Sequence, residues 1–197
     1  METKDGVKTF YAKDREAWRK WLSEHCDKAK SVWLIIYKKG ATKKSISYAE
    51  AVEEALCFGW IDSKPNKRNE ESFYQFFAKR NPSSNWSRIN KARVKKLMEE
   101  GLMTPPGMAV IKQAKANGKW EALDDTENLV IPGDLKTLLK ANREAAAHFE
   151  AFPRSVKRGI LEWILNAKTP ATRLRRIEET VSLAANNVRA NQYKPKP

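Results

Sequence analysis

The chain has 197 residues, and its 38 Lys and Arg against 24 Asp and Glu give a formal net charge of +14 at pH 7. A hydrophobic content of 41%, including seven Trp, is enough to bury a core and excludes an intrinsically disordered chain. The polar first residues argue against a secretion signal, and the apolar run at 32–36 is far short of the ~20 residues that a membrane span needs.

The first predicted elements are a helix and a strand. Asp14 is a good N-cap for a helix that runs to about Cys26, because its side chain can accept a hydrogen bond from the first turn. Ser31–Tyr37 is short and rich in β-branched and aromatic residues, and the polar sequence after it stops the run. This pattern is typical of a strand.

A second helix and two further strands follow. Ser47 and Glu50 have the spacing of a capping box, in which the two side chains satisfy reciprocal backbone donors. The helix that they open ends near Gly59. Residues 60–63 and 72–78 favour strands joined by a polar turn, which would complete a small antiparallel sheet with the first strand.

Two more helices are predicted before an acidic loop. Residues 86–100 form a helix closed by Gly101, and residues 105–117 form a shorter one that ends at Gly118. Residues 119–132 contain an acidic stretch and no clear periodicity, so we interpret them as a linker loop.

Everything beyond the linker has helical periodicity. We expect helices at 133–140, 143–152, 155–167 and 171–186. The predicted fold class is α+β, a small antiparallel β-sheet packed with helices and followed by an all-helical C-terminal module. The expected domains are an α+β core at 1–118, the linker at 119–132, the helical module at 133–188 and a disordered tail at 189–197.

The helix at 86–100 contains the best candidate for a binding site. Helical projection places Trp86, Ile89, Val94 and Leu97 on one side, with Asn90 and Arg93 among them. An inward guanidinium needs a carboxylate, a carbonyl array or a bound anion. Either Arg93 pairs with Asp62 and only holds the fold together, or it belongs to a ligand pocket. The residues of that pocket would be Trp60, Asp62, Arg80, Trp86, Ser87, Asn90 and Arg93.

Other residues favour structural interpretations. His25 and His148 have no metal partner at a usual spacing, and Cys57 follows a helix C-terminus, so we interpret it as a small buried hydrophobe. The sequence has no Walker A loop, dinucleotide fingerprint, HExxH or nucleophile elbow. It therefore predicts no metal site, cofactor or catalytic residue, and it leaves open whether the protein is an enzyme.

The basic residues allow a second interpretation. Residues 79–96 contain seven Lys and Arg and no acid, and Arg173, Arg175 and Arg176 cluster near the end of the chain. Such surfaces attract phosphates, which makes nucleic acid a candidate partner. An ordinary solvated surface explains the same pattern.

Three segments carry a resemblance to a known family. Residues 48–62 (YAEAVEEALCFGWID), 85–107 (NWSRINKARVKKLMEEGLMTPPG) and 167–181 (AKTPATRLRRIEETV) resemble the YdeI/OmpD-associated, or bacteriocin-protection, family over about residues 10–187. The resemblance implies a bacterial, cytoplasmic α+β protein with a role in tolerance to bacteriocins or antimicrobial stress. It implies no reaction and no cofactor. The family often has Pro before the position of Arg80, where this chain has Lys79, so the exit of that strand can differ.

The sequence therefore allows three alternative functions. The first is binding of a small anionic or aromatic ligand in a pocket lined by Trp and Arg. The second is a nucleic-acid-binding accessory role for the basic helices. The third is a stress-related protein-interaction module. We expect a cytoplasmic location and no membrane span, and the sequence does not give the oligomeric state.

Overall fold

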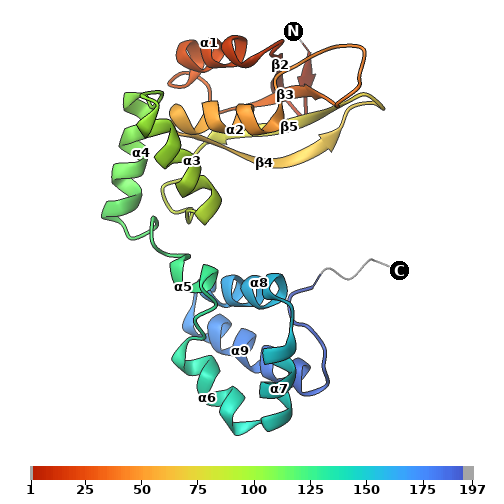
Figure 1. Cartoon of the computed structure of the whole chain (residues 1–197), viewed down its shortest axis with the longest axis vertical. Helices are drawn as coiled ribbons and strands as arrows, with labels where there is room; N and C mark the ends of the chain where they lie inside the picture. The colour runs from red at the N-terminus through yellow and green to blue at the C-terminus, as the bar shows by residue number, and fades with distance from the viewer. Residues whose placement is uncertain (1, 193–197) are drawn as a thin grey trace. The chain divides into compact units, whose positions relative to one another are not determined.

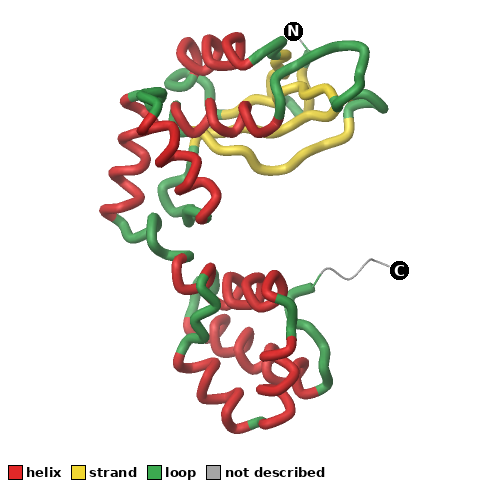
Figure 2. The backbone as a smooth tube through the Cα atoms, viewed as in Figure 1, coloured by secondary structure: helices red, strands yellow, loops and turns green. Residues whose placement is uncertain are grey.

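The computed structural model describes residues 2–192 and divides into two compact units between Glu121 and Ala122 (Figure 1). The N-terminal unit combines a sheet with helices, and the C-terminal unit is helical (Figure 2). The α+β class is confirmed. No helix of the described residues is long and apolar enough to cross a membrane.

The sheet has five strands in the order β1-β2-β3-β5-β4 within the described residues. The strands are β1 (Thr3–Lys4), β2 (Val7–Tyr11), β3 (Ser31–Tyr37), β4 (Trp60–Lys67) and β5 (Ser72–Lys79). The predicted antiparallel arrangement of β3, β5 and β4 is confirmed. The sheet is nevertheless mixed, because β2 lies parallel to β3, and neither β1 nor β2 was predicted.

Strand β4 is longer than the predicted residues 60–63. The pairing register with β5 shifts between Asp62 and Pro65, and the strand then continues to Lys67. A proline inside this strand is tolerated because β4 lies at the edge of the sheet and the irregularity falls next to it.

Helices α1 (Arg15–His25) and α2 (Tyr48–Cys57) lie against one face of the sheet (Figure 1). Both predicted caps form: Asp14 accepts a hydrogen bond from the amide of Ala17, and Ser47 and Glu50 make the reciprocal capping box. Alternate residues of β3, Val32, Leu34 and Ile36, enter the hydrophobic core with these helices. The core thus occupies one side of the sheet.

Helices α3 (Arg88–Glu99) and α4 (Pro105–Ala116) complete the N-terminal unit. Trp86, Val94 and Leu97 are buried in the same core, as the projection predicted. Ile89 is 66% exposed, so its predicted place on the apolar side is wrong. The helix begins two residues later than predicted, because Ser87 caps it, and Ile89 falls in its first turn on the solvent side.

The C-terminal unit packs its helices around a second hydrophobic core. They are α5 (Asp124–Glu127), α6 (Gly133–Ala141), α7 (Arg143–Ala151), α8 (Arg154–Leu165) and α9 (Pro170–Ala185). The four longer helices agree closely with the predicted ones, and the short α5 lies within the predicted linker loop. Ala190 is buried in this core, so the predicted tail at 189–197 begins with a packed segment. Residues 193–197 lie outside the described residues.

Candidate functional site

The two tryptophans predicted to line a pocket are buried. Trp60 is 1% exposed and donates its indole N–H to the carbonyl of Cys26, at 3.4 Å. Trp86 is 2% exposed, and the guanidinium of Arg80 covers its ring at 3.8 Å from the centroid. Neither ring is available to stack against a ligand in this conformation.

Arg80 is held within the protein. Its Nη2 donates to the carbonyl of Asn85 at 2.6 Å. Burial lowers the pKa of Arg80 to about 10, and the negative charge of nearby Asp62 acts in the opposite direction. The role of this side chain is to join the end of β5 to the segment before α3 and to cover Trp86.

The remaining predicted residues form a polar cluster between α2, β4 and α3. Arg93 donates to the side-chain oxygen of Asn90 at 3.1 Å, and Asp62 accepts from the hydroxyl of Tyr48 at 2.6 Å. Among the described residues no ion pair joins Arg93 to Asp62, so the first of the two alternatives for Arg93 does not form. Ser87 is the N-cap of α3. Ligand binding by this set stays a prediction.

Tyr48 was missed by sequence reasoning, because the capping-box interpretation concerned only its neighbours Ser47 and Glu50. Burial raises the pKa of Tyr48 to about 12, and the hydrogen bond to Asp62 adds to the rise. From the ordinary pKa of 10.0 up to 12, the unfolded chain therefore loses the phenol proton while the folded chain keeps it. Stability must then fall as the pH rises through this range.

We expect the variant Tyr48→Phe to lose part of this pH dependence. Its free energy of unfolding should fall less steeply than that of the wild type as the pH rises above 10, measured by urea unfolding at a series of pH values. Tyr37→Phe, which removes a phenol elsewhere in the same unit, is the control and should retain the wild-type slope. Equal slopes for all three proteins would contradict the assignment.

A different part of the N-terminal unit forms an open groove of about 400 Å³. We call it the α1–β2 groove. It lies between the last turn of α1, the start of β2 and the start of β3. The groove is lined by apolar side chains, three lysines and one histidine. The principal ones are Phe10, Trp21, Val32, Lys8, Lys28, Lys30 and His25.

The groove exists because two parallel strands separate at their beginnings. The ladder between β2 and β3 begins at Thr9 and Trp33, which are the third residues of their strands. The first two residues of each strand, starting at Val7 and Ser31, therefore lie outside the ladder and line the groove instead. Trp21 and His25 of α1 form another wall.

The wall of α1 is a stack of rings. Trp21 lies parallel to Trp18 with centroids 5.1 Å apart, and it lies parallel to His25 at 4.7 Å with an interplanar angle of 2°. The helical spacing of i, i+3 and i+7 produces this row on one face of α1. The Nδ1 of His25 lies 2.8 Å from the carbonyl of Trp21, and a carbonyl only accepts, so Nδ1 carries the proton. Nε2 is then the nitrogen that a ligand can contact.

The charges of the groove have one sign. Lys8, Lys28 and Lys30 are exposed, and the described lining of the groove includes no carboxylate. An aromatic wall with convergent cations is the usual composition of a site for an anionic, ring-bearing molecule. Sequence reasoning considered His25 only as a metal ligand and did not predict β2, which is why it missed the groove. The Asp5-Gly6 pair before residues 7–11 was the available signal, because Asp-Gly favours a two-residue hairpin turn.

The basic residues near the end of the chain are largely engaged within their own unit. Arg173 makes a bidentate pair with Asp134, at 2.7 and 3.0 Å. Arg176 donates to the carbonyl of Trp163 and lies over its ring, whereas Arg175 is exposed.

Cys57 is buried, as predicted, and burial raises its thiol pKa to about 11. Among the described residues no cluster of His, Cys, Asp and Glu could hold a metal ion.

Comparisons with known families match each unit separately. Residues 10–110 match the model of a domain of unknown function (DUF8412). Residues 128–187 match a family described as bacteriocin-protection, YdeI or OmpD-associated. The resemblance to the second family is confirmed for this C-terminal part, while the segments at 48–62 and 85–107 lie in the match to the first. No curated protein and no solved structure matches the chain.

Proposed function

The chain belongs to the DUF8412 family, and from this premise we propose that it binds a small anionic or aromatic ligand in the α1–β2 groove. The match to this family contains most of the groove, including Phe10, Trp21 and His25. The observation that carries the proposal is a wall of aromatic rings beside three lysines, with no carboxylate in the described lining.

The lysines and the aromatic side chains of the groove would contact different parts of the ligand. The lysines attract a phosphate or carboxylate, and the half-buried rings of Trp21 and His25 offer apolar surface to the rest of the molecule. The lysine ammonium groups keep their mobility, so they contribute to encounter and orientation more than to rigid recognition. The ligand class is therefore a compact ring with an acidic group.

The C-terminal unit suggests the setting in which such binding is used. Its match is described as bacteriocin-protection, YdeI or OmpD-associated. We extend the proposal to a cytoplasmic protein that contributes to tolerance of bacteriocins or antimicrobial stress. In this view the helical unit is the part that docks a partner protein.

Two simple anions test the groove, adenosine monophosphate and benzoate, with adenosine and inorganic phosphate as half-ligands. At least one of the two anions is expected to raise the thermal midpoint in a concentration-dependent way, because a ligand that binds only the folded state stabilises it. The double variant Lys28→Gln/Lys30→Gln should weaken the apparent affinity about tenfold, since it removes charge-assisted contacts. The measurement is differential scanning fluorimetry at several ligand concentrations.

The control is Lys38→Gln/Lys39→Gln, which makes the same change in charge at two exposed lysines outside the groove. It should bind like the wild type. The proposal fails if neither anion shifts the midpoint, or if the control loses affinity as much as the groove variant does.

A further inference from the structure

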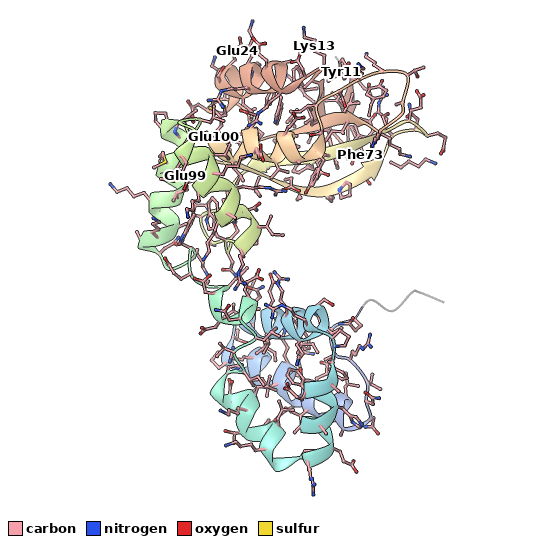
Figure 3. The ribbon with its side chains drawn as sticks, viewed as in Figure 1. Tyr11, Lys13, Glu24, Phe73, Glu99 and Glu100 are labelled. Carbon is pink, nitrogen blue, oxygen red and sulfur yellow. The ribbon has the colours of Figure 1, made fainter. Side chains whose placement is uncertain are left out.

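The face of the sheet turned away from α1 and α2 carries a row of aromatic side chains. Strand alternation and pairing place them: Trp33 lies opposite Phe76 across the β3–β5 ladder, and Ile35 lies between Tyr11 and Tyr74 on its two neighbours. We call this the aromatic face, and it comprises Tyr11, Trp33, Tyr37, Tyr74 and Phe76. Side chains extend from the sheet on both sides (Figure 3).

The strand residues of the N-terminal core come mainly from the other face. Val32, Leu34 and Ile36 of β3 and Phe77 of β5 join the buried cluster with the helices, whereas Trp33 alternates with them and points away. The rings of the aromatic face pack against one another instead. Trp33 lies 4.9 Å from Phe76 and 6.1 Å from Tyr74, both with steep interplanar angles.

Cationic side chains cover these rings. The ammonium of Lys4 lies 5.5 Å from the rings of both Trp33 and Tyr74, and that of Lys64 lies 5.8 Å from Trp33. Arg68 lies 5.8 Å from the ring of Tyr74. Lys4 and Arg68 pair with Asp5 and Glu2, at 3.5 and 3.3 Å, and their side chains are 23% and 25% exposed. The face is therefore both aromatic and positively charged.

Two further observations indicate that the aromatic face has a hydrogen-bond donor without a partner and rings that are partly accessible. Trp33 is 1% exposed, yet its indole N–H has no hydrogen-bond partner among the described residues. Tyr74 and Phe76 are only half-buried, although they lie on a central strand of the sheet. The acids nearby, Glu2 and Asp5, contact Tyr74, Arg68 and Lys4 from the edge of the face.

We propose that the aromatic face binds single-stranded nucleic acid, with bases stacked on the rings of β5 and backbone phosphates held by the surrounding Lys and Arg. Aromatic side chains on central strands, flanked by cations, supply both terms that single-strand binding needs. Stacking on aromatic rings suits unpaired bases, whose π-faces are accessible, and does not suit a duplex. The site is separate from the α1–β2 groove.

The test is fluorescence anisotropy with fluorescein-labelled oligothymidylate and oligouridylate of about 12 nucleotides. Phe76→Leu keeps an apolar side chain of similar size and removes the ring. It should weaken binding about 5-fold or more. Lys64→Gln should weaken binding and flatten its dependence on salt concentration. Circular dichroism confirms that each variant is folded.

The matched control is Phe73→Leu, the same substitution on the same strand but on the opposite face, where Phe73 packs against the core. It should leave binding unchanged. Blunt duplex DNA of the same length should bind more weakly than the single strand, and polyglutamate should not displace the oligonucleotide at equal charge. Equal losses in the two Phe variants, tighter binding of duplex, or efficient displacement by polyglutamate would each overturn the proposal.

Discussion

Replacing Glu54 with Gln is expected to destabilise the N-terminal unit by about 3–5 kcal/mol, because the change leaves two cations beside a buried site without their shared counter-charge. Glu54 is 1% exposed and accepts from Arg15 at 2.5 Å and from Arg19 at 2.7 Å. Arg19 also donates to the carbonyl of Leu102 at 2.8 Å. One carboxylate therefore organises contacts among α1, α2 and the segment after α3.

The neighbouring variant Glu53→Gln is the control for this prediction. Glu53 pairs with Arg15 at 3.2 Å but lies nearer the surface, and a partly exposed pair of this kind contributes only about 0–1 kcal/mol. Urea unfolding followed by tryptophan fluorescence suits the comparison, because six of the seven Trp lie in residues 1–121. Similar losses of stability in the two variants would show that the buried position of Glu54 has no special role.

Replacing Gly107 with Ala is expected to be the second most damaging change. A Cβ at this position would lie 2.2 Å from the backbone carbonyl oxygen of Cys57, which is far inside contact distance. The backbone at the end of α2 cannot swing aside as a side chain could, so α4 must shift away. We expect a loss of about 1–3 kcal/mol, measured as a lower midpoint in urea unfolding.

Gly159→Ala separates this steric effect from the ordinary effect of glycine in a helix. Gly159 lies in α8, and an added Cβ there meets nothing within 4 Å. Alanine is a better helix former than glycine, so this variant should gain about 0.5–1 kcal/mol, followed by circular dichroism. The same Gly→Ala substitution is thus expected to lower the free energy of unfolding at Gly107 and to raise it at Gly159. A gain of stability in Gly107→Ala would refute the close packing of α4 on α2.

Most of the elements could be predicted from local signals. The capping residues Asp14 and Ser47 and the glycines after the helices gave bounds that agree with the structure within a few residues. The C-terminal helices were clear because their apolar stripes follow a helical period. Such features depend only on residues close together in the sequence.

The N-terminal hairpin was missed although a local signal was present. Asp5 and Gly6 both have positive φ, 51° and 75°, and they form the two-residue turn between β1 and β2. An Asp-Gly pair is a strong hairpin signal. It was hidden because β1 has only two residues and the strands are rich in Lys, so no alternation stood out. The parallel partner of β2 lies more than twenty residues away, which no local pattern specifies.

The candidate site was harder to predict than the fold. Helical projection placed Arg93 toward the apolar side, but it could not show that Asn90 would accept a hydrogen bond from the guanidinium. It also could not show that Arg80 would cover Trp86 from another element. The grooves and faces proposed as binding sites depend on which strands are neighbours. That information appears only when the chain is folded.

The presence of a separate hydrophobic core in each unit has a consequence for the evolution of the chain. A substitution that disrupts the packing around Glu54 need not alter the core around Phe149, so its harm stays within one half of the chain. Selection can then refine the two halves at different rates, and recombination can exchange one of them intact. Relatives that carry only one half, joined to an unrelated partner, are the expected trace of such a history.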